Sequence, residues 1–288
     1  MRALFKLIFA ELRRYYRSPI VLVLQALTVY NAYAFYVFSC GRVEKGPVED
    51  LIYSIFSIPQ TDFVIWEMLV LGITVSIVVG RSIASRSAVN KLVSGHSKGK
   101  IYCSSLIAAM IFGAVKGLSF SLVYVSLTWV PKNQTPALIA TYIGAALPFV
   151  LIAAFFAASM LFIPNRSLAM VLCISLLLTG VFIEGNLEQS LNQPKIRVDL
   201  SGKVRDNPKY VSGIRRIIYT HIFDRLPFRQ FKESTEIEWP LWIDQRPDED
   251  EIYNSHLEKL KKPIAQTLSA TACMFLFGYL IYRKKSFK

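Results

Sequence analysis

This sequence lacks the short motifs by which common nucleotide-binding and catalytic sites are recognised. The stretch KLVSGHSKGKIYCS (91–104) has glycines and lysines, but only three residues separate Gly95 from Gly99, and Ile101 follows the last lysine. A phosphate loop needs four residues between its glycines, and a hydroxyl residue after its lysine. HExxH, GxSxG, CxxC and acid-rich metal motifs are also absent. These absences argue against an enzyme, although an intramembrane enzyme can use widely separated residues.

Cysteine and histidine are scarce as well. The three histidines stand alone in polar segments, and the four cysteines lie far apart, in or at the edge of apolar runs. The cysteines are Cys40, Cys103, Cys173 and Cys273. This spacing predicts neither a disulfide framework nor a metal site, so we expect the cysteines to serve as small packing residues.

Long apolar runs are what the sequence has in place of these motifs. Of its 288 residues, 53% are hydrophobic. Runs of about 20 apolar residues are long enough to cross a membrane as helices. The six runs are Ile20–Cys40, Phe63–Gly80, Cys103–Val130, Ala137–Ile163, Leu168–Ile183 and Ile264–Tyr282. We therefore expect an all-α, multi-pass protein of the cell membrane with six transmembrane helices.

The basic residues are distributed unevenly between the segments that join these runs. The chain carries a net charge of +13. In residues 2–17, 81–102 and 283–288 the charged residues are basic with the sole exception of Glu11. The segments expected on the opposite side of the membrane carry equal numbers of basic and acidic residues. Because cytoplasmic loops are enriched in Lys and Arg, both termini are expected to be cytoplasmic. The excess charge is therefore a topological signal and does not require a nucleic acid partner.

The same pattern divides the chain into parts. Residues 1–186 are expected to form a membrane domain that contains five spans. Its lead, residues 2–17, is an amphipathic helix suited to the membrane interface, where its cations meet anionic lipids. Residues 187–262 are predicted to be an extracellular helical subdomain, with one helix before Pro227 and another that continues into the sixth span. Residues 263–288 are that span and a basic cytosolic tail.

Charged and small residues within the spans are the candidates for a path or an interface. Lys116 lies near the middle of the third run, between Gly113 and Gly117, whose spacing allows another helix to approach closely. A charge at this depth is costly, so Lys116 is expected to face protein, water or a partner, or to be paired for packing alone. Glu67 lies near the outer end of the second run. Counted by helical rise, Lys116 is too deep to assume a direct pair with Glu67.

The segment 81–102 contains a short predicted helix that ends at Gly95. Such a helix can transmit force from a soluble partner, or the segment can be only a solvated basic loop. Three stretches resemble bacterial ABC transporter permeases of the type-2 exporter family. They are NKLVSGHSKGKIYCSSLI (90–107), HIFDRLPFRQ (221–230) and the lead ending in RRYYRSP. The resemblance covers the order of parts along essentially the whole chain, but it does not explain Lys116.

The resemblance implies a permease subunit of an ATP-driven exporter that pairs with a second permease chain and with a separate ABC ATPase. Residues 86–95 would be the coupling helix. The residues expected to meet the ATPase are Arg86, Asn90, Lys91, Leu92 and Gly95. This chain would hold no cofactor of its own, since ATP and Mg would bind the ATPase. The cargo could be a peptide, bacteriocin, drug or lipid. The alternatives are an ATPase-independent membrane enzyme or sensor working through residues 187–262, and an ion-coupled carrier.

Overall fold

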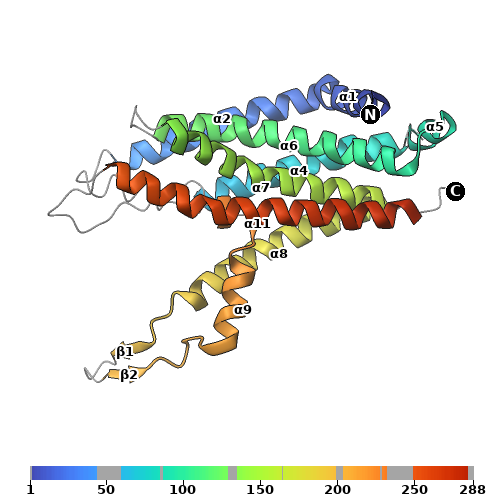
Figure 1. Ribbon diagram of the computed structural model, residues 1–288. Helices are drawn as coiled ribbons and strands as arrows, with labels where there is room; N and C mark the ends of the chain where they lie inside the picture. Colours follow the sequence, from blue (N-terminus) through green and yellow to red (C-terminus); the bar gives the residue numbers. More distant parts are fainter. Residues whose placement is uncertain are drawn as a thin grey trace.

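The computed structural model describes most of the chain. The described residues are 2–43, 60–84, 87–128, 135–163, 165–198, 204–227, 229–231 and 249–284. Within them the long helices are α2 (Pro19–Val43), α4 (Gln60–Ala84), α6 (Lys98–Thr128), α7 (Thr135–Phe162), α8 (Arg166–Leu191) and α11 (Glu249–Lys284). The shorter helices are α1 (Arg2–Arg17), α5 (Ser87–Val93) and α9 (Gly213–Phe223). Figure 1 places α1, α5 and the last turn of α11 at one end of the helical bundle, which we call the basic end.

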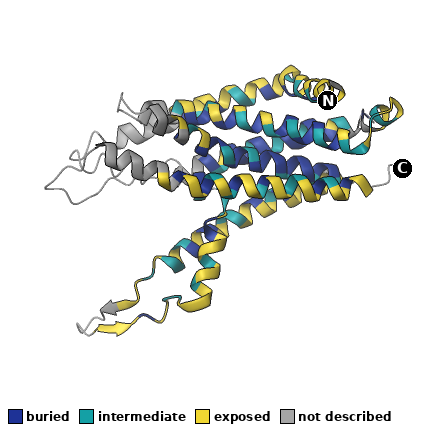
Figure 2. Cartoon of the chain, in the orientation of Figure 1, coloured by how far each residue is buried: buried dark blue, intermediate teal, exposed yellow. Residues whose placement is uncertain are grey.

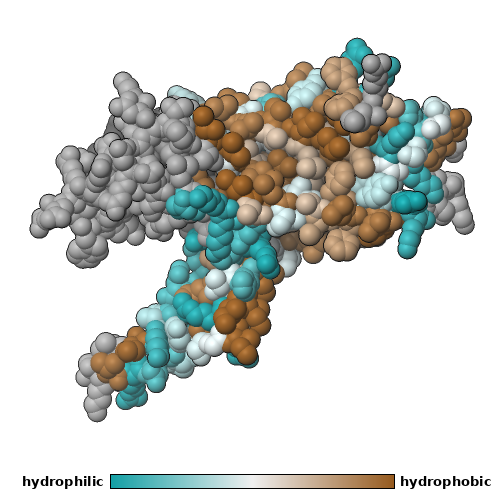
Figure 3. All heavy atoms as spheres, viewed as in Figure 1, coloured by the Kyte–Doolittle hydropathy of each residue, from teal (hydrophilic) through white to brown (hydrophobic). Residues whose placement is uncertain are grey.

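Five of the described helices are long and apolar enough to cross a membrane. Their apolar segments are Val64–Ser82, Lys98–Val123, Thr141–Phe162, Ser167–Leu191 and Leu260–Lys284. The described part of α2 adds a shorter apolar segment, Pro19–Tyr33. Figure 3 shows a largely hydrophobic surface along the bundle and hydrophilic residues at the basic end. The chain is thus a mainly helical, multi-pass membrane protein, as the apolar runs predicted.

Helix α7 lies at the centre of the bundle and packs against α4, α6, α8 and α11. Figure 2 shows the buried residues gathered between these helices, whereas α8 and α11 are exposed along much of their length. The close approach predicted at Gly113 and Gly117 is made by α7. A Cβ at Gly113 would lie 2.7 Å from the Cβ of Ala153, and one at Gly117 would lie 2.9 Å from the Cα of Ala146. The two helices therefore touch through their backbones.

Substituting Gly113 by alanine should push α6 and α7 apart. The added methyl group would meet Ala153 and the backbone carbonyl oxygen of Phe149, 2.8 Å away. Gly180→Ala in α8 is the matched control, because a Cβ there has nothing within 4 Å. The gain in helix propensity is shared by both variants, so we expect Gly113→Ala to be less stable than Gly180→Ala by about 1–3 kcal/mol. Unfolding by denaturant in detergent micelles measures the difference, and equal stabilities would contradict this packing.

Helix α8 continues beyond the predicted end of the membrane domain at residue 186 and reaches Leu191. Its second half, α9 and a small hairpin project from the bundle as an arm (Figure 1). The hairpin pairs β1 (Ile196–Val198) with β2 (Val204–Asp206) in antiparallel register. It is a departure from the purely helical subdomain predicted for 187–262. The amphipathic helix predicted before Pro227 is confirmed as α9.

Helix α11 continues without a break into the last candidate membrane span, Leu260–Lys284. It begins at Glu249, contains Pro263 and continues into the last span, as predicted for the second helix of 187–262. The Lys262 ammonium donates to the Asp224 carboxylate just after α9, at 2.5 Å. The side chains of Thr267 and Gln230 are also hydrogen-bonded. The start of the span is thereby fastened to the segment that follows α9.

Candidate functional site

The last residue of the short helix α5 is Val93, and Gly95 terminates the helix, as the sequence predicts. Gly95 has a φ of +84°, a conformation that favours glycine. Its amide donates to the Leu92 carbonyl oxygen at 2.9 Å, and the His96 amide donates to the Lys91 carbonyl oxygen at 3.0 Å. This double closure is the Schellman motif of a helix end. It turns the chain sharply into α6, which begins at Lys98.

One face of α5 points away from the bundle. Val89 and Asn90 are exposed on it, and Val93 is 84% exposed. Val89 and Val93 are four residues apart and therefore share a helical face. Of the residues predicted to meet an ATPase, Asn90 lies on this exposed side and Leu92 is half-buried. Arg86 lies outside the described residues.

The other face of α5 is fastened to α1 through a buried acid. Lys91 forms an ion pair with Glu11 of α1, and Glu11 is only 4% exposed. Arg14, one turn along α1, pairs with the same carboxylate at 3.2 Å. Breaking such a pair by removing one partner would leave a buried charge under-compensated. The only acid in the basic lead therefore holds the two helices together.

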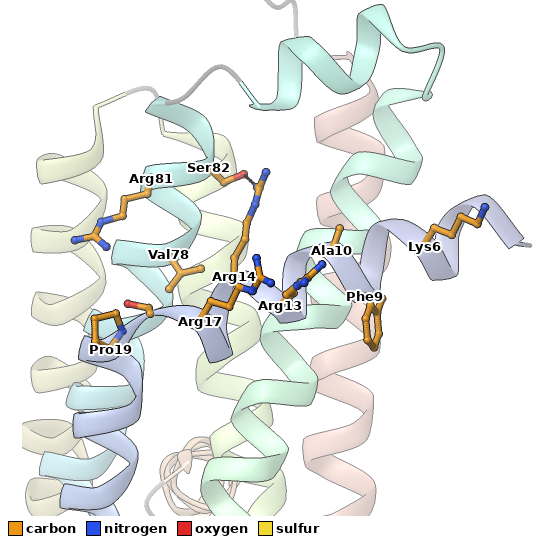
Figure 4. A pocket seen from close by; sticks show the side chains of 11 residues that line it. Lys6, Phe9, Ala10, Arg13, Arg14, Arg17, Pro19, Val78, Arg81 and Ser82 are labelled. Atoms are coloured by element: carbon orange, nitrogen blue, oxygen red, sulfur yellow. Dashed lines mark hydrogen bonds between the residues drawn. The ribbon is translucent and has the colours of Figure 1, made fainter.

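Arg14 extends this junction to α4. One nitrogen of its guanidinium donates to Ser82 Oγ at 2.6 Å, and the other donates to Ser87 Oγ at 2.7 Å. Figure 4 shows Arg14 rising from α1 to Ser82 at the end of α4. We call Glu11, Arg14, Ser82, Ser87 and Lys91 the junction cluster. It joins α1, α4 and α5 through charged hydrogen bonds, which are stronger than neutral ones.

Lys91 was expected from the sequence to meet an ATPase, and its pairing with Glu11 and the rest of the junction cluster were not predicted. A signal was present, because Glu11 is the one acid among many basic residues in these segments. A lone acid in a basic helix that faces the protein is a candidate ion-pair partner. The serines gave no comparable signal, since their roles depend on how α4 and α5 are placed in space.

A ring stack fixes α1 against the membrane bundle. Tyr15 is buried and stacks on Phe112 of α6, with ring centroids 4.7 Å apart. Burial raises the pKa of the Tyr15 hydroxyl well above its ordinary value, and the negative charge of Glu11 raises it further. Tyr15 therefore stays neutral. Together with the junction cluster, this stack ties α1 to three other helices.

A second polar cluster lies inside the bundle. The Lys116 ammonium is 3.2 Å from the Glu67 carboxylate, and both side chains are 1% exposed. Thr28 donates a hydrogen bond to Glu67 at 2.8 Å, and Asn31 donates another at 2.6 Å. We call these four residues the buried polar cluster. It connects α2, α4 and α6, and each Glu67 oxygen accepts at least one hydrogen bond.

The sequence placed Lys116 too deep to assume a direct pair with Glu67, and the structure shows that the two do pair. Glu67 is three residues from the Val64 end of the α4 span, and Lys116 is seven residues from the Val123 end of the α6 span. At about 1.5 Å per residue, the two positions differ in depth by about 6 Å. The four-carbon stem of lysine reaches across that difference. Lys116 therefore points to α4, whereas Gly113 and Gly117 contact α7.

The described residues contain no group of histidine, cysteine and acidic side chains that could hold a metal ion. Cys103, Cys173 and Cys273 are all free thiols. Comparisons with protein-family models, with curated proteins and with solved structures found no match to this chain. The candidate functional site is therefore defined by its own geometry: a displayed helix, α5, held by the junction cluster.

Proposed function

We propose that this chain is the permease subunit of an ATP-driven exporter and that α5 receives the force of a separate ATPase. The proposal includes α2 as a sixth span, a cytosolic basic end and a second permease chain across the translocation path. It is supported by the resemblance of 90–107 and 221–230 to ABC transporter permeases of the type-2 exporter family. The cargo class stays open among peptides, bacteriocins, drugs and lipids.

The observation that carries this proposal is the two-sided character of α5. Its outer side exposes Val89, Asn90 and Val93, and its inner side is bound through Lys91 and Ser87. A helix of only seven residues is marginal by itself, so it needs such an anchor to act as a rigid body. A partner that contacts the outer side can then move the anchored helix as a unit.

The junction cluster provides a route by which such a movement would reach the membrane spans. Lys91 would pass a displacement of α5 to α1 through Glu11. Arg14 would pass it to the end of α4 through Ser82, and Tyr15 would pass it to α6 through Phe112. Hydrogen-bonded and stacked contacts between rigid helices are the physical means by which distant sites are coupled.

Co-purification tests the proposal. A C-terminally tagged chain extracted in mild detergent from host cells should recover a soluble ATPase in stoichiometric amount. Val93→Glu should reduce that recovery, because it places a charge on the apolar part of the exposed side of α5. Gly95→Pro should also reduce it, because proline lacks the amide that donates to Leu92 and its φ cannot become positive. Gly185→Ala is the control, because a Cβ at Gly185 has nothing within 4 Å.

Two results would contradict the exporter proposal. One is recovery of the chain alone from a preparation that preserves known membrane complexes. The other is recovery of an ATPase that is unaffected by Val93→Glu and Gly95→Pro. The comparison is valid only if both variants insert into the membrane normally, which protease accessibility of the tag measures.

A second candidate function, an ion-coupled carrier, is favoured by the pairing of Glu67 with Lys116. Ionisable residues inside membrane spans often mark ion or proton paths, and the buried polar cluster contains one of each sign. An exporter that uses this cluster only for packing does not need its charges. Removal of both charges therefore separates the two functions.

A further inference from the structure

A second feature of the basic end is a hollow beside the junction cluster. It has a volume of about 660 Å³ and is bounded by α1, the start of α2 and the end of α4. Figure 4 shows Lys6 at one side of the hollow, Arg81 at the other and the arginines of α1 between them. The hollow therefore lies where the chain passes from the amphipathic α1 into the apolar segment Pro19–Tyr33.

The charge of this hollow has one sign. Its cations are Lys6, Arg13, Arg14, Arg17 and Arg81, and no acidic residue is among the described residues that line it. Arg14 is engaged by the junction cluster. Within the described part of the chain, the other four cations make no hydrogen bond or ion pair. Like charges in one hollow repel each other, so an anion that binds between them would be stabilised.

The hollow is also partly apolar. Phe9 is 71% exposed at its rim, and Val78 and Pro19 contribute to its lining. Ile20 and Leu22, which follow Pro19 at the start of α2, are exposed as well. An aqueous anion alone would gain nothing from these side chains. A molecule with a charged head and a hydrocarbon tail would contact both parts.

We propose that this hollow binds the headgroup of an anionic phospholipid, with the phosphate between the arginines of α1 and Arg81 and an acyl chain along the apolar side. Arginine suits this role because its planar guanidinium can bind phosphate oxygens in pairs. The chain is a membrane protein and the hollow adjoins its apolar segments, so a lipid reaches it from the bilayer. The inference does not depend on the exporter proposal, because it involves no ATPase and no cargo.

Lipid titration of the full-length protein in a nonionic detergent tests this inference. Phosphatidylglycerol and phosphatidylcholine are the two probes, and native mass spectrometry counts the bound molecules. We expect one phosphatidylglycerol to bind more tightly than the rest and phosphatidylcholine to bind without such a preference. Arg17→Gln and Arg81→Gln should each weaken the tight binding about fivefold, as expected for one lost cation at an anionic surface.

The matched controls are Arg283→Gln and Lys284→Gln, which remove exposed cations from the basic end of α11. They should leave the tight binding unchanged. If the Arg81 variant does not fold, Arg13→Gln on the exposed side of α1 serves in its place, since Arg13 has no partner among the described residues. Equal weakening by hollow and control variants would overturn the inference, because binding would then follow net charge alone.

Glycerol 3-phosphate distinguishes a lipid from a soluble phosphate ester. It carries the phosphate without acyl chains, so we expect it to displace phosphatidylglycerol only at far higher concentration. Displacement at equal concentration would overturn the lipid assignment and make the hollow a site for a soluble phosphate ester. Equal binding of phosphatidylcholine and phosphatidylglycerol would overturn the assignment as well, since it would show that the cations do not select the headgroup.

Discussion

Lys116→Met is expected to destabilise the membrane bundle by about 3–5 kcal/mol, because it leaves the Glu67 carboxylate buried without its cation. Both side chains are 1% exposed, so water does not compensate for the loss. Thr28 and Asn31 would still donate hydrogen bonds to Glu67, but neither supplies a positive charge. The free energy of unfolding, measured by denaturation in detergent micelles, gives the effect directly.

Lys261→Met is the matched control for this experiment. Lys261 also pairs with a carboxylate, that of Glu258, but the two side chains are 70% and 71% exposed. Exposed ion pairs contribute about 1 kcal/mol or less, so the control variant should stay close to the wild type. Similar decreases in the free energy of unfolding in the two variants would show that the buried polar cluster contributes no more to stability than an exposed ion pair.

The double variant Lys116→Met with Glu67→Gln separates structure from ion coupling. It removes both charges and leaves a glutamine that can still hydrogen-bond to Thr28 and Asn31. Replacing a buried ion pair by neutral residues is often neutral or stabilising, so most of the stability should return. If transport returns with stability, the pair serves packing and the carrier function is excluded. A stable double variant that cannot transport would favour the ion-coupled carrier over the exporter.

The positions of the helices could be predicted because each depends on a local signal. The apolar runs marked α4, α6, α7, α8 and α11, and the glycine at position 95 marked the end of α5. The spacing of Gly113 and Gly117 indicated a close helix contact. These features follow from the chemistry of residues that are near each other in the chain.

The partners of the charged residues could not be predicted, because they come from distant parts of the chain. Glu67 and Lys116 meet only because α4 brings Glu67 within reach of the long Lys116 side chain on α6, and Glu11 meets Lys91 only because the fold brings α1 and α5 together at the basic end. The hairpin was missed for a different reason. Its strands have three residues each, too few for a pattern of alternating hydrophobicity to be recognised.

Lys91→Glu is expected to release α5 from α1. The substitution places a second carboxylate next to Glu11, which is buried, so attraction is replaced by repulsion. A helix of seven residues is unstable without its anchor, and the amides of 87–95 should exchange with solvent at least about tenfold faster, corresponding to about 1.4 kcal/mol. Hydrogen–deuterium exchange followed by mass spectrometry measures this rate without any assumption about transport.

Lys100→Glu is the control, because it makes the same change of charge in the exposed first turn of α6. We expect exchange in 87–95 to be unchanged by it. In the proposed exporter, Lys91→Glu should also abolish the transport that hydrolysis drives, because a released α5 cannot pass a displacement to α1. Unchanged exchange in Lys91→Glu would show that the junction cluster does not hold α5. Faster exchange with normal transport would show that α5 is anchored there but does not carry the force, and the coupling assignment would then be wrong.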